Sequence, residues 1–168
     1  MPVGEAPHRE VAQDPGGAIR ARLCDRALDS DPRFAVSRVE TGREGPSFTA
    51  DTLRLLSEES PEDELVLIMG ADQASALASW HEPETVLSLA RVAVASREGM
   101  EREAVTRRLN GLPGHEDIEF FDMPRLDVSS SLVRARVAEG LPIRYLVPPG
   151  VADEIDAEGL YGAGEGDG

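Results

Sequence analysis

Apolar residues recur along the chain with two spacings, and segments of the two kinds alternate. Apolar runs of the kind that form buried parallel strands cover residues 64–70, 91–96 and 118–121, and residues 34–39 alternate between apolar and polar positions. Apolar positions three or four residues apart predict helices elsewhere. The expected helices cover residues 18–28, 47–56, 83–90, 101–110, 130–139 and 148–158. Gly111, Gly140 and Gly159 are expected to end three of them.

Strands that alternate with helices are typical of an α/β fold with an open, doubly wound parallel sheet. Ligands of such sheets bind beyond the carboxyl ends of the strands, so functional side chains are expected there. A chain of 168 residues with 40% hydrophobic content has the size of one domain, which we expect over residues 1–161. The small, acidic tail of residues 162–168 is expected to be disordered.

Composition excludes several classes of function. The net charge of −15 argues against nucleic-acid binding, which normally requires a basic surface. The apolar runs are too short to span a bilayer and no signal-type stretch follows Met1, so we expect a cytoplasmic protein without membrane contact. The single cysteine, Cys24, excludes a disulfide framework and is expected to be buried. His115 has no second His or Cys at metal-ligand spacing, so no metal site is assigned.

A serine cluster opens the helix expected from residue 130. The first backbone amides of a helix lack partners within it, so Ser129, Ser130 and Ser131 form a candidate anion site. Arg134 lies one turn further on, and its side chain can lean back towards the same anion. The alternative is an ordinary serine-capped helix with a solvated arginine.

Two further segments combine turns with polar side chains. Gly45-Pro46 predicts a tight turn, after which the hydroxyls of Ser47 and Thr49 are expected to cap the next helix; capping alone would explain this segment. Asp72 follows an expected strand, where a carboxylate can accept hydrogen bonds from a ribose or cap a helix. Trp80 offers either a stacking surface or a core aromatic.

These segments resemble known families. Val128-Ser129-Ser130-Ser131-Leu132-Val133-Arg134 is similar to the Ile-Ser-Ser-Thr-x-Ile-Arg signature of the nucleotidyltransferases related to class I tRNA synthetases. Residues 43–52 resemble the Arg-x-Gly-x-Ser-Tyr-Thr-x-Asp-Thr segment of the nicotinate-nucleotide adenylyltransferases, with Phe48 in place of the tyrosine. Gly70-Ala71-Asp72 and Trp80-His81 resemble two more segments of that family.

The resemblance implies a Rossmann-like fold and a site for ATP and nicotinic acid mononucleotide (NaMN). It implies that Ser129, Ser130, Ser131 and Arg134 bind ATP, and that Mg²⁺ accompanies its phosphates. It also implies that Thr49, Trp80 and His81 bind NaMN, that Asp72 binds ribose, and that Arg9 of Pro7-His8-Arg9 contacts a phosphate. Tyr145-Leu146-Val147-Pro148 and Leu160-Tyr161 resemble closing packing elements of the family.

One family motif does not occur in the sequence. The Gly-x-Phe-Asp-Pro-x-His-x-Gly-His signature, whose histidines stabilise the α-phosphate of ATP, is absent, so no catalytic residue is assigned. We expect that Met1 is not the natural start, that a strand-helix-strand unit with the first two central strands of the sheet precedes it, and that the chain as given is inactive.

The function implied is adenylyl transfer from ATP to NaMN, which gives nicotinic acid adenine dinucleotide (NaAD) and pyrophosphate in NAD biosynthesis. The serine-arginine signature alone does not separate this reaction from that of phosphopantetheine adenylyltransferase. Segments 43–52 and 80–81 favour the nicotinate enzyme, since they have no role in reading pantetheine. A non-catalytic, nucleotide-binding remnant is the second alternative.

Overall fold

The computed structural model of the chain describes residues 1–6, 14–96, 100–124 and 126–162. The chain divides into two compact units, one of residues 48–126 and the other of residues 1–47 together with those from 127 onward. The single domain expected from the sequence stays a prediction. Among the described residues, no helix has the length and apolar character needed to cross a membrane.

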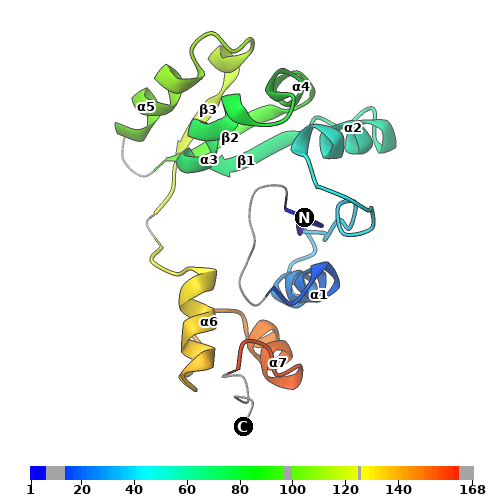
Figure 1. The fold of residues 1–168 in the computed structure, drawn as a ribbon, viewed down its shortest axis with the longest axis vertical. Helices are drawn as coiled ribbons and strands as arrows, with labels where there is room; N and C mark the ends of the chain where they lie inside the picture. The colour runs from blue at the N-terminus through cyan, green and yellow to red at the C-terminus, as the bar shows by residue number, and fades with distance from the viewer. Residues whose placement is uncertain (7–13, 97–99, 125, 163–168) are drawn as a thin grey trace. The chain divides into compact units, whose positions relative to one another are not determined.

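A parallel sheet forms the centre of the unit of residues 48–126 (Figure 1). Strand β1 spans Val66–Gly70, β2 spans Arg91–Ser96 and β3 spans Glu119–Asp122, in the order β1-β2-β3. Both pairs of neighbours are parallel, with Leu67 opposite Val92 and Val94 opposite Phe120. The α/β fold and the three strand segments expected at 64–70, 91–96 and 118–121 are thereby confirmed.

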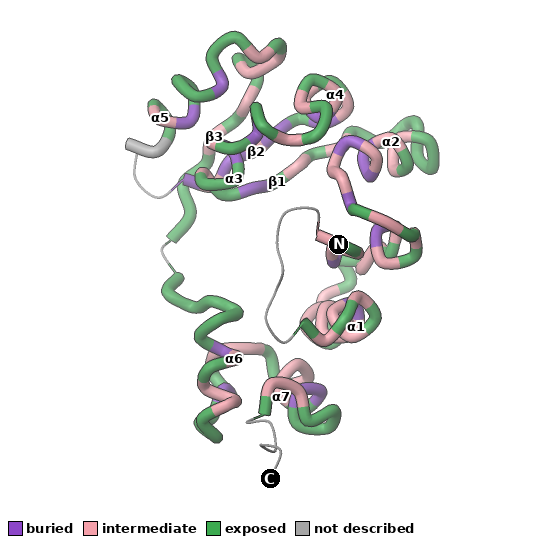
Figure 2. Tube along the Cα trace, in the orientation of Figure 1, coloured by how far each residue is buried: buried purple, intermediate pink, exposed green. Residues whose placement is uncertain are grey.

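Helices lie before β1 and between the strands, and they cover one face of this sheet. They are α2 (Thr49–Glu59), α3 (Ala71–Ala76), α4 (Pro83–Leu89) and α5 (Met100–Leu109), with short 3-10 turns η1 (Leu77–Ser79) and η2 (His115–Asp117). Figure 2 shows buried positions concentrated along β2, where Val92 and Val94 are 2% and 0% exposed. Leu77, Val86 and Val105 pack into the same core. Burial of these side chains therefore holds the helices against this face of the sheet.

The sequence prediction of a fully buried first strand is wrong for β1. Leu67 and Met69 pack into the core, but Val66 is 49% exposed and Ile68 is 67% exposed. Successive side chains of a strand point to opposite faces, and β1 lies at the edge of the sheet. A continuous apolar run therefore gives a strand two apolar faces. In β1 only one of these faces is covered by the core.

In its described residues the other unit contains three helices, α1 (Gly17–Leu28), α6 (Ser130–Ala138) and α7 (Pro149–Ala157). They correspond to helices expected from the sequence, and Gly140 ends α6 with a φ of 67°, a conformation that glycine adopts without strain. Val133, Ile143 and Ile155 form the centre of a small core. Leu160 and Tyr161 pack against it, as expected of closing elements.

Three sequence predictions in this unit are wrong. Residues 34–39 form no strand, and Phe34 is 58% exposed, because alternation alone does not supply the partner that a strand's backbone groups need. Tyr145 does not pack, since its side chain is 95% exposed. A turn closed by the hydrogen bond from Leu146 N to Ile143 O directs the side chains of Ile143 and Leu146 towards the core instead. Cys24 is half-buried rather than buried.

Helices α1 and α7 lie side by side and are joined by a carboxylate between two arginines. Arg22 Nε donates to Glu154 Oε1 over 2.9 Å, and Arg26 Nε donates to Oε2 over 3.1 Å. The Glu154 side chain is only 10% exposed. Donation from Arg22 and then Arg26 lowers the pKa of the Glu154 carboxyl from its ordinary 4.5.

This pair of bonds predicts a specific acid sensitivity. A carboxyl whose pKa is lowered on folding contributes stability above its ordinary pKa of 4.5 and loses that contribution as the pH falls through the folded-state pKa. Glu154→Gln should therefore lower the melting temperature at pH 7 and reduce its dependence on pH below 5. Melting curves from pH 7 to pH 3 test this, with the exposed Glu139→Gln as control. Equal acid sensitivity of the parent and Glu154→Gln would contradict it.

Candidate functional site

The start of α2 is built by a turn and by a hydrophobic N-cap residue. Gly45 has a φ of 82°, which confirms the expected turn, and α2 begins at Thr49 with Phe48 as N-cap. Phe48 supplies no side-chain cap, and the Ser47 hydroxyl instead accepts a hydrogen bond from Gly4 N over 3.2 Å. The expected capping by Ser47 and Thr49 is thus wrong, because the Ser47 hydroxyl is already used. The N-cap position of α2 therefore supplies no side-chain oxygen to the start of the helix.

Trp80 and His81 follow directly on η1. Trp80 N donates to Leu77 O over 3.0 Å, and the indole is half-buried against the core of the sheet unit. His81 is exposed, and its ring lies 4.5 Å from the Phe48 ring, centroid to centroid, at an interplanar angle of 37°. This contact brings together two sequence segments that are more than thirty positions apart, both of which the family resemblance assigns to NaMN.

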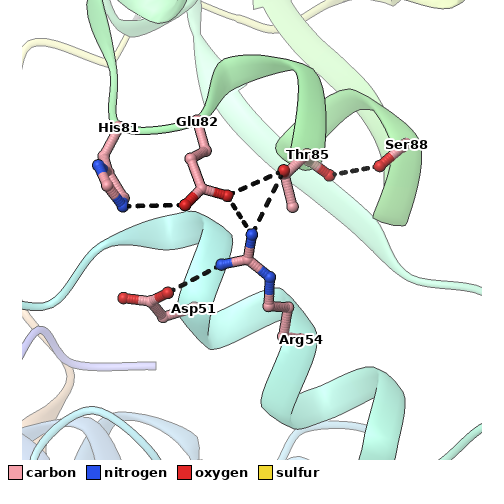
Figure 3. A network of polar contacts seen from close by, with 6 residues as sticks. All are labelled: Asp51, Arg54, His81, Glu82, Thr85 and Ser88. Carbon is pink, nitrogen blue, oxygen red and sulfur yellow. Dashed lines mark hydrogen bonds and ion pairs between the residues drawn. The ribbon is translucent and has the colours of Figure 1, made fainter.

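A polar network extends from His81 to the body of α2 (Figure 3). His81 Nε2 lies 3.3 Å from Glu82 Oε1. The other carboxylate oxygen of Glu82 accepts from Thr85 Oγ1 over 3.1 Å and from Arg54 Nη2. Arg54 Nη1 also donates to Asp51 over 3.0 Å. Donation from Arg54, and then from Thr85, lowers the pKa of the Glu82 carboxyl.

Asp72 lies just beyond the carboxyl end of β1, in the first turn of α3. The N-cap residue of α3 is Gly70, so Asp72 is not the helix cap that the sequence allowed. The Asp72 side chain is exposed. Within the described parts of the chain, it forms no hydrogen bond to Thr49, Trp80 or His81. The carboxylate remains available at the edge of the sheet where α/β proteins bind ligands.

The serine cluster has the geometry that its sequence predicts. Ser129 caps α6, its Oγ accepting from Leu132 N over 3.2 Å, and Ser130 and Ser131 are exposed in the first turn. Arg134 Nη2 donates to Ser131 Oγ over 3.3 Å, so the guanidinium returns to the helix start. Three kinds of donor thus gather at the positive end of the α6 dipole: amides, hydroxyls and a guanidinium.

Two further segments were singled out by the sequence, around Arg9 and at His115. Arg9 and His8 lie outside the described residues. His115 is half-buried, and its Nδ1 lies 2.8 Å from Leu112 O. Among the described residues no three His, Cys, Asp or Glu side chains gather in a way that could hold a metal ion.

Sequence reasoning missed Arg54 and Glu82. The relevant signals are weak: Arg54 stands three residues after Asp51 on a helix, and Glu82 stands just before the proline that begins α4. Either pattern alone is typical of a solvated surface. Only the fold shows that the two side chains meet next to His81.

Comparison with known proteins identifies relatives of the whole chain. The model of the cytidylyltransferase-like family matches residues 4–136. A protein of Tropheryma whipplei (strain Twist), named a probable nicotinate-nucleotide adenylyltransferase, is 39% identical over 161 residues, which cover 96% of this chain and 81% of the relative. A protein of the same name from Roseiflexus sp. (strain RS-1) is 39% identical over 163 residues, or 96% and 80% of the two chains.

Solved structures share the fold. Plasmodium falciparum nicotinic acid mononucleotide adenylyltransferase, complexed with NaAD, superposes with a TM-score of 0.68 over 94% of this chain and 78% of that chain, at 17% identity. The same enzyme complexed with APC gives a TM-score of 0.66 at 18% identity, over 89% and 78% of the two chains. At these identities the likeness shows a common fold.

Proposed function

Because the chain belongs to the nicotinate-nucleotide adenylyltransferases of the cytidylyltransferase-like family, we propose that it recognises NaMN and ATP for adenylyl transfer. The observation that carries the proposal is the contact of Phe48 with His81, which joins the start of α2 to the Trp80-His81 segment. These are the two segments whose sequences separate the nicotinate enzymes from other nucleotidyltransferases.

NaMN recognition requires a surface for a flat, electron-poor ring and donors for its carboxylate. Trp80 is half-buried against the core, so its indole is fixed by packing and can stack on the pyridine ring. The backbone amides of Thr49, at the positive end of α2, and of His81 are the proposed carboxylate donors. Backbone amides recognise the carboxylate without a cation, which suits a site in an acidic chain.

ATP recognition is assigned to the start of α6. Ser129, Ser130, Ser131 and Arg134 would hold the phosphates, and Asp72 would accept hydrogen bonds from a ribose. In the reaction a phosphate oxygen of NaMN attacks the α-phosphorus of ATP, and the bond to the β-phosphate breaks as pyrophosphate leaves. Protein groups contribute by positioning and charge stabilisation without a covalent intermediate.

The remaining expectations belong to the same proposal. Mg²⁺ would enter bound to the ATP phosphates, as part of the substrate, and no step is assigned to a protein-held ion. Arg9 would contact a phosphate of one substrate. The proposal also retains a cytoplasmic location. It excludes nucleic acid as a partner, which the net charge of −15 supports.

Ligand binding tests this recognition directly. Calorimetric titrations should show saturable binding of NaMN and of MgATP, and no binding of phosphopantetheine. Binding of phosphopantetheine without NaMN would replace the proposal with the pantetheine enzyme. Binding of MgATP alone would favour a non-catalytic nucleotide-binding remnant.

A further inference from the structure

Glu82 has a backbone conformation that a glutamate rarely adopts. Its φ is 48° and its ψ is 60°, which is the left-handed region, and among the described non-glycine residues only Tyr161 shares a positive φ. A side chain at such a position strains the backbone, and the conformation persists where surrounding contacts hold it. Glu82 is the N-cap residue of α4, so the chain turns at this position from the Trp80-His81 segment into the helix.

The Glu82 carboxylate supplies those contacts. It is the common acceptor for Arg54 on α2 and for Thr85 in the first turn of α4, while its second oxygen faces His81 (Figure 3). Arg54 is itself oriented by Asp51, one turn earlier on α2. The residue after His81 is therefore tied to two helices at once.

Helix α2 meets the Trp80-His81 segment at two separate points. Phe48, its N-cap residue, contacts the His81 ring, and Arg54, in the middle of the helix, contacts Glu82. Two contacts from one rigid helix restrict the orientation of the Trp80-His81 segment relative to α2. A single contact would leave the segment free to rotate about that point. These two contacts hold the start of α2 close to the Trp80-His81 segment, and with it the amides of Thr49 and His81.

We propose that Arg54 and Glu82 are positioning residues, which hold the Trp80-His81 segment against the start of α2 and thereby set the affinity for the carboxylate of a pyridine mononucleotide. This inference rests on the proposed function. Both side chains are about as exposed as typical surface ion pairs, at 40% and 42%, so a purely structural role would give only a small change in melting temperature.

The test compares NaMN affinity with ATP affinity in matched variants. Arg54→Gln and Glu82→Gln should each weaken NaMN binding about three- to fivefold, the range that exposed ion pairs allow, and leave ATP binding unchanged. Arg91→Gln is the control, since Arg91 is also a half-exposed arginine of this unit with two carboxylate partners, Glu64 and Glu119. It lies at the amino end of β2, so its loss should leave NaMN affinity at the parental value.

A double variant tests whether Arg54 and Glu82 act together through their mutual contact. Arg54→Gln/Glu82→Gln should weaken NaMN binding about as much as either single change, whereas independent effects would multiply to roughly tenfold or more. Parental NaMN affinity in both single variants, or an equal loss in Arg91→Gln, would overturn the inference.

A ligand-free measurement separates this inference from the proposed function. The ring protons of His81 lie next to the Phe48 ring, so their NMR shifts report that contact directly. Both single variants should move these resonances, and Arg91→Gln should not. A parent that binds no NaMN would contradict the proposed function. Unchanged chemical shifts of His81 in both variants would overturn the positioning role, whether or not the parent binds NaMN.

Discussion

Replacing Arg134 with alanine is expected to weaken MgATP binding about tenfold to a hundredfold, the range for hydrogen bonds to a charged group. The guanidinium already returns to the start of α6 through its bond to Ser131, so little ordering is needed before it meets a phosphate. Arg134→Lys should recover only part of the loss, because an ammonium cannot span two phosphate oxygens as a planar fork does. Calorimetric titration with MgATP measures both effects.

Arg136→Ala is the matched control for Arg134. Arg136 belongs to the same helix, but its Nε donates to Pro142 O, away from the helix start. Its replacement should leave MgATP affinity unchanged. Parental MgATP affinity in Arg134→Ala, in a protein with the parental melting temperature, would remove Arg134 from the proposed ATP site.

Replacing Trp80 with alanine is expected to weaken NaMN binding about tenfold or less, since aromatic stacking contributes on the order of 1 kcal/mol. MgATP binding should stay unchanged, because the proposed ATP donors belong to α6. Trp80 also packs against the core, so Trp80→Ala alone could act through stability. Trp80→Phe, which retains an aromatic face, should preserve most of the NaMN affinity and the melting temperature.

Calorimetric titrations of Trp80→Ala and Trp80→Phe with NaMN and with MgATP separate a loss of stacking from a loss of stability. An alanine variant that binds NaMN like the parent would contradict stacking on Trp80. So would equal losses of NaMN and MgATP affinity, because they would indicate a general loss of folded protein.

The strand-helix alternation was predictable because local sequence carries it. Residues 92–95 are all apolar and belong to the central strand β2, in which Val92 and Val94 are buried as expected. Residues 34–39 alternate between apolar and polar positions, which also predicts a strand, yet they form none, because a strand depends on a partner that periodicity does not reveal. The prediction that Ile68 of β1 is buried failed for the same reason, because the sequence indicates an apolar face of the strand but not what covers that face.

The candidate site was predictable where a short segment contains all its parts. The serine cap and Arg134 lie within one helix turn of each other, so their contact follows from helical geometry. The capping expected of Ser47 failed because its hydroxyl bonds to Gly4, more than forty positions away. The Arg54–Glu82 contact was missed for the same reason, since neither partner is singled out by its neighbours in sequence.

The most direct test of the central claim uses the chain's single tryptophan, Trp80. Its fluorescence reports the proposed NaMN site alone, and an electron-poor pyridine ring stacked on the indole should quench it. With absorption by the ligand corrected, NaMN should quench the emission in a saturable way at the affinity measured by calorimetry, while phosphopantetheine should leave it unchanged. Emission that does not respond to saturating NaMN, or that responds equally to phosphopantetheine, would contradict recognition of NaMN by Trp80.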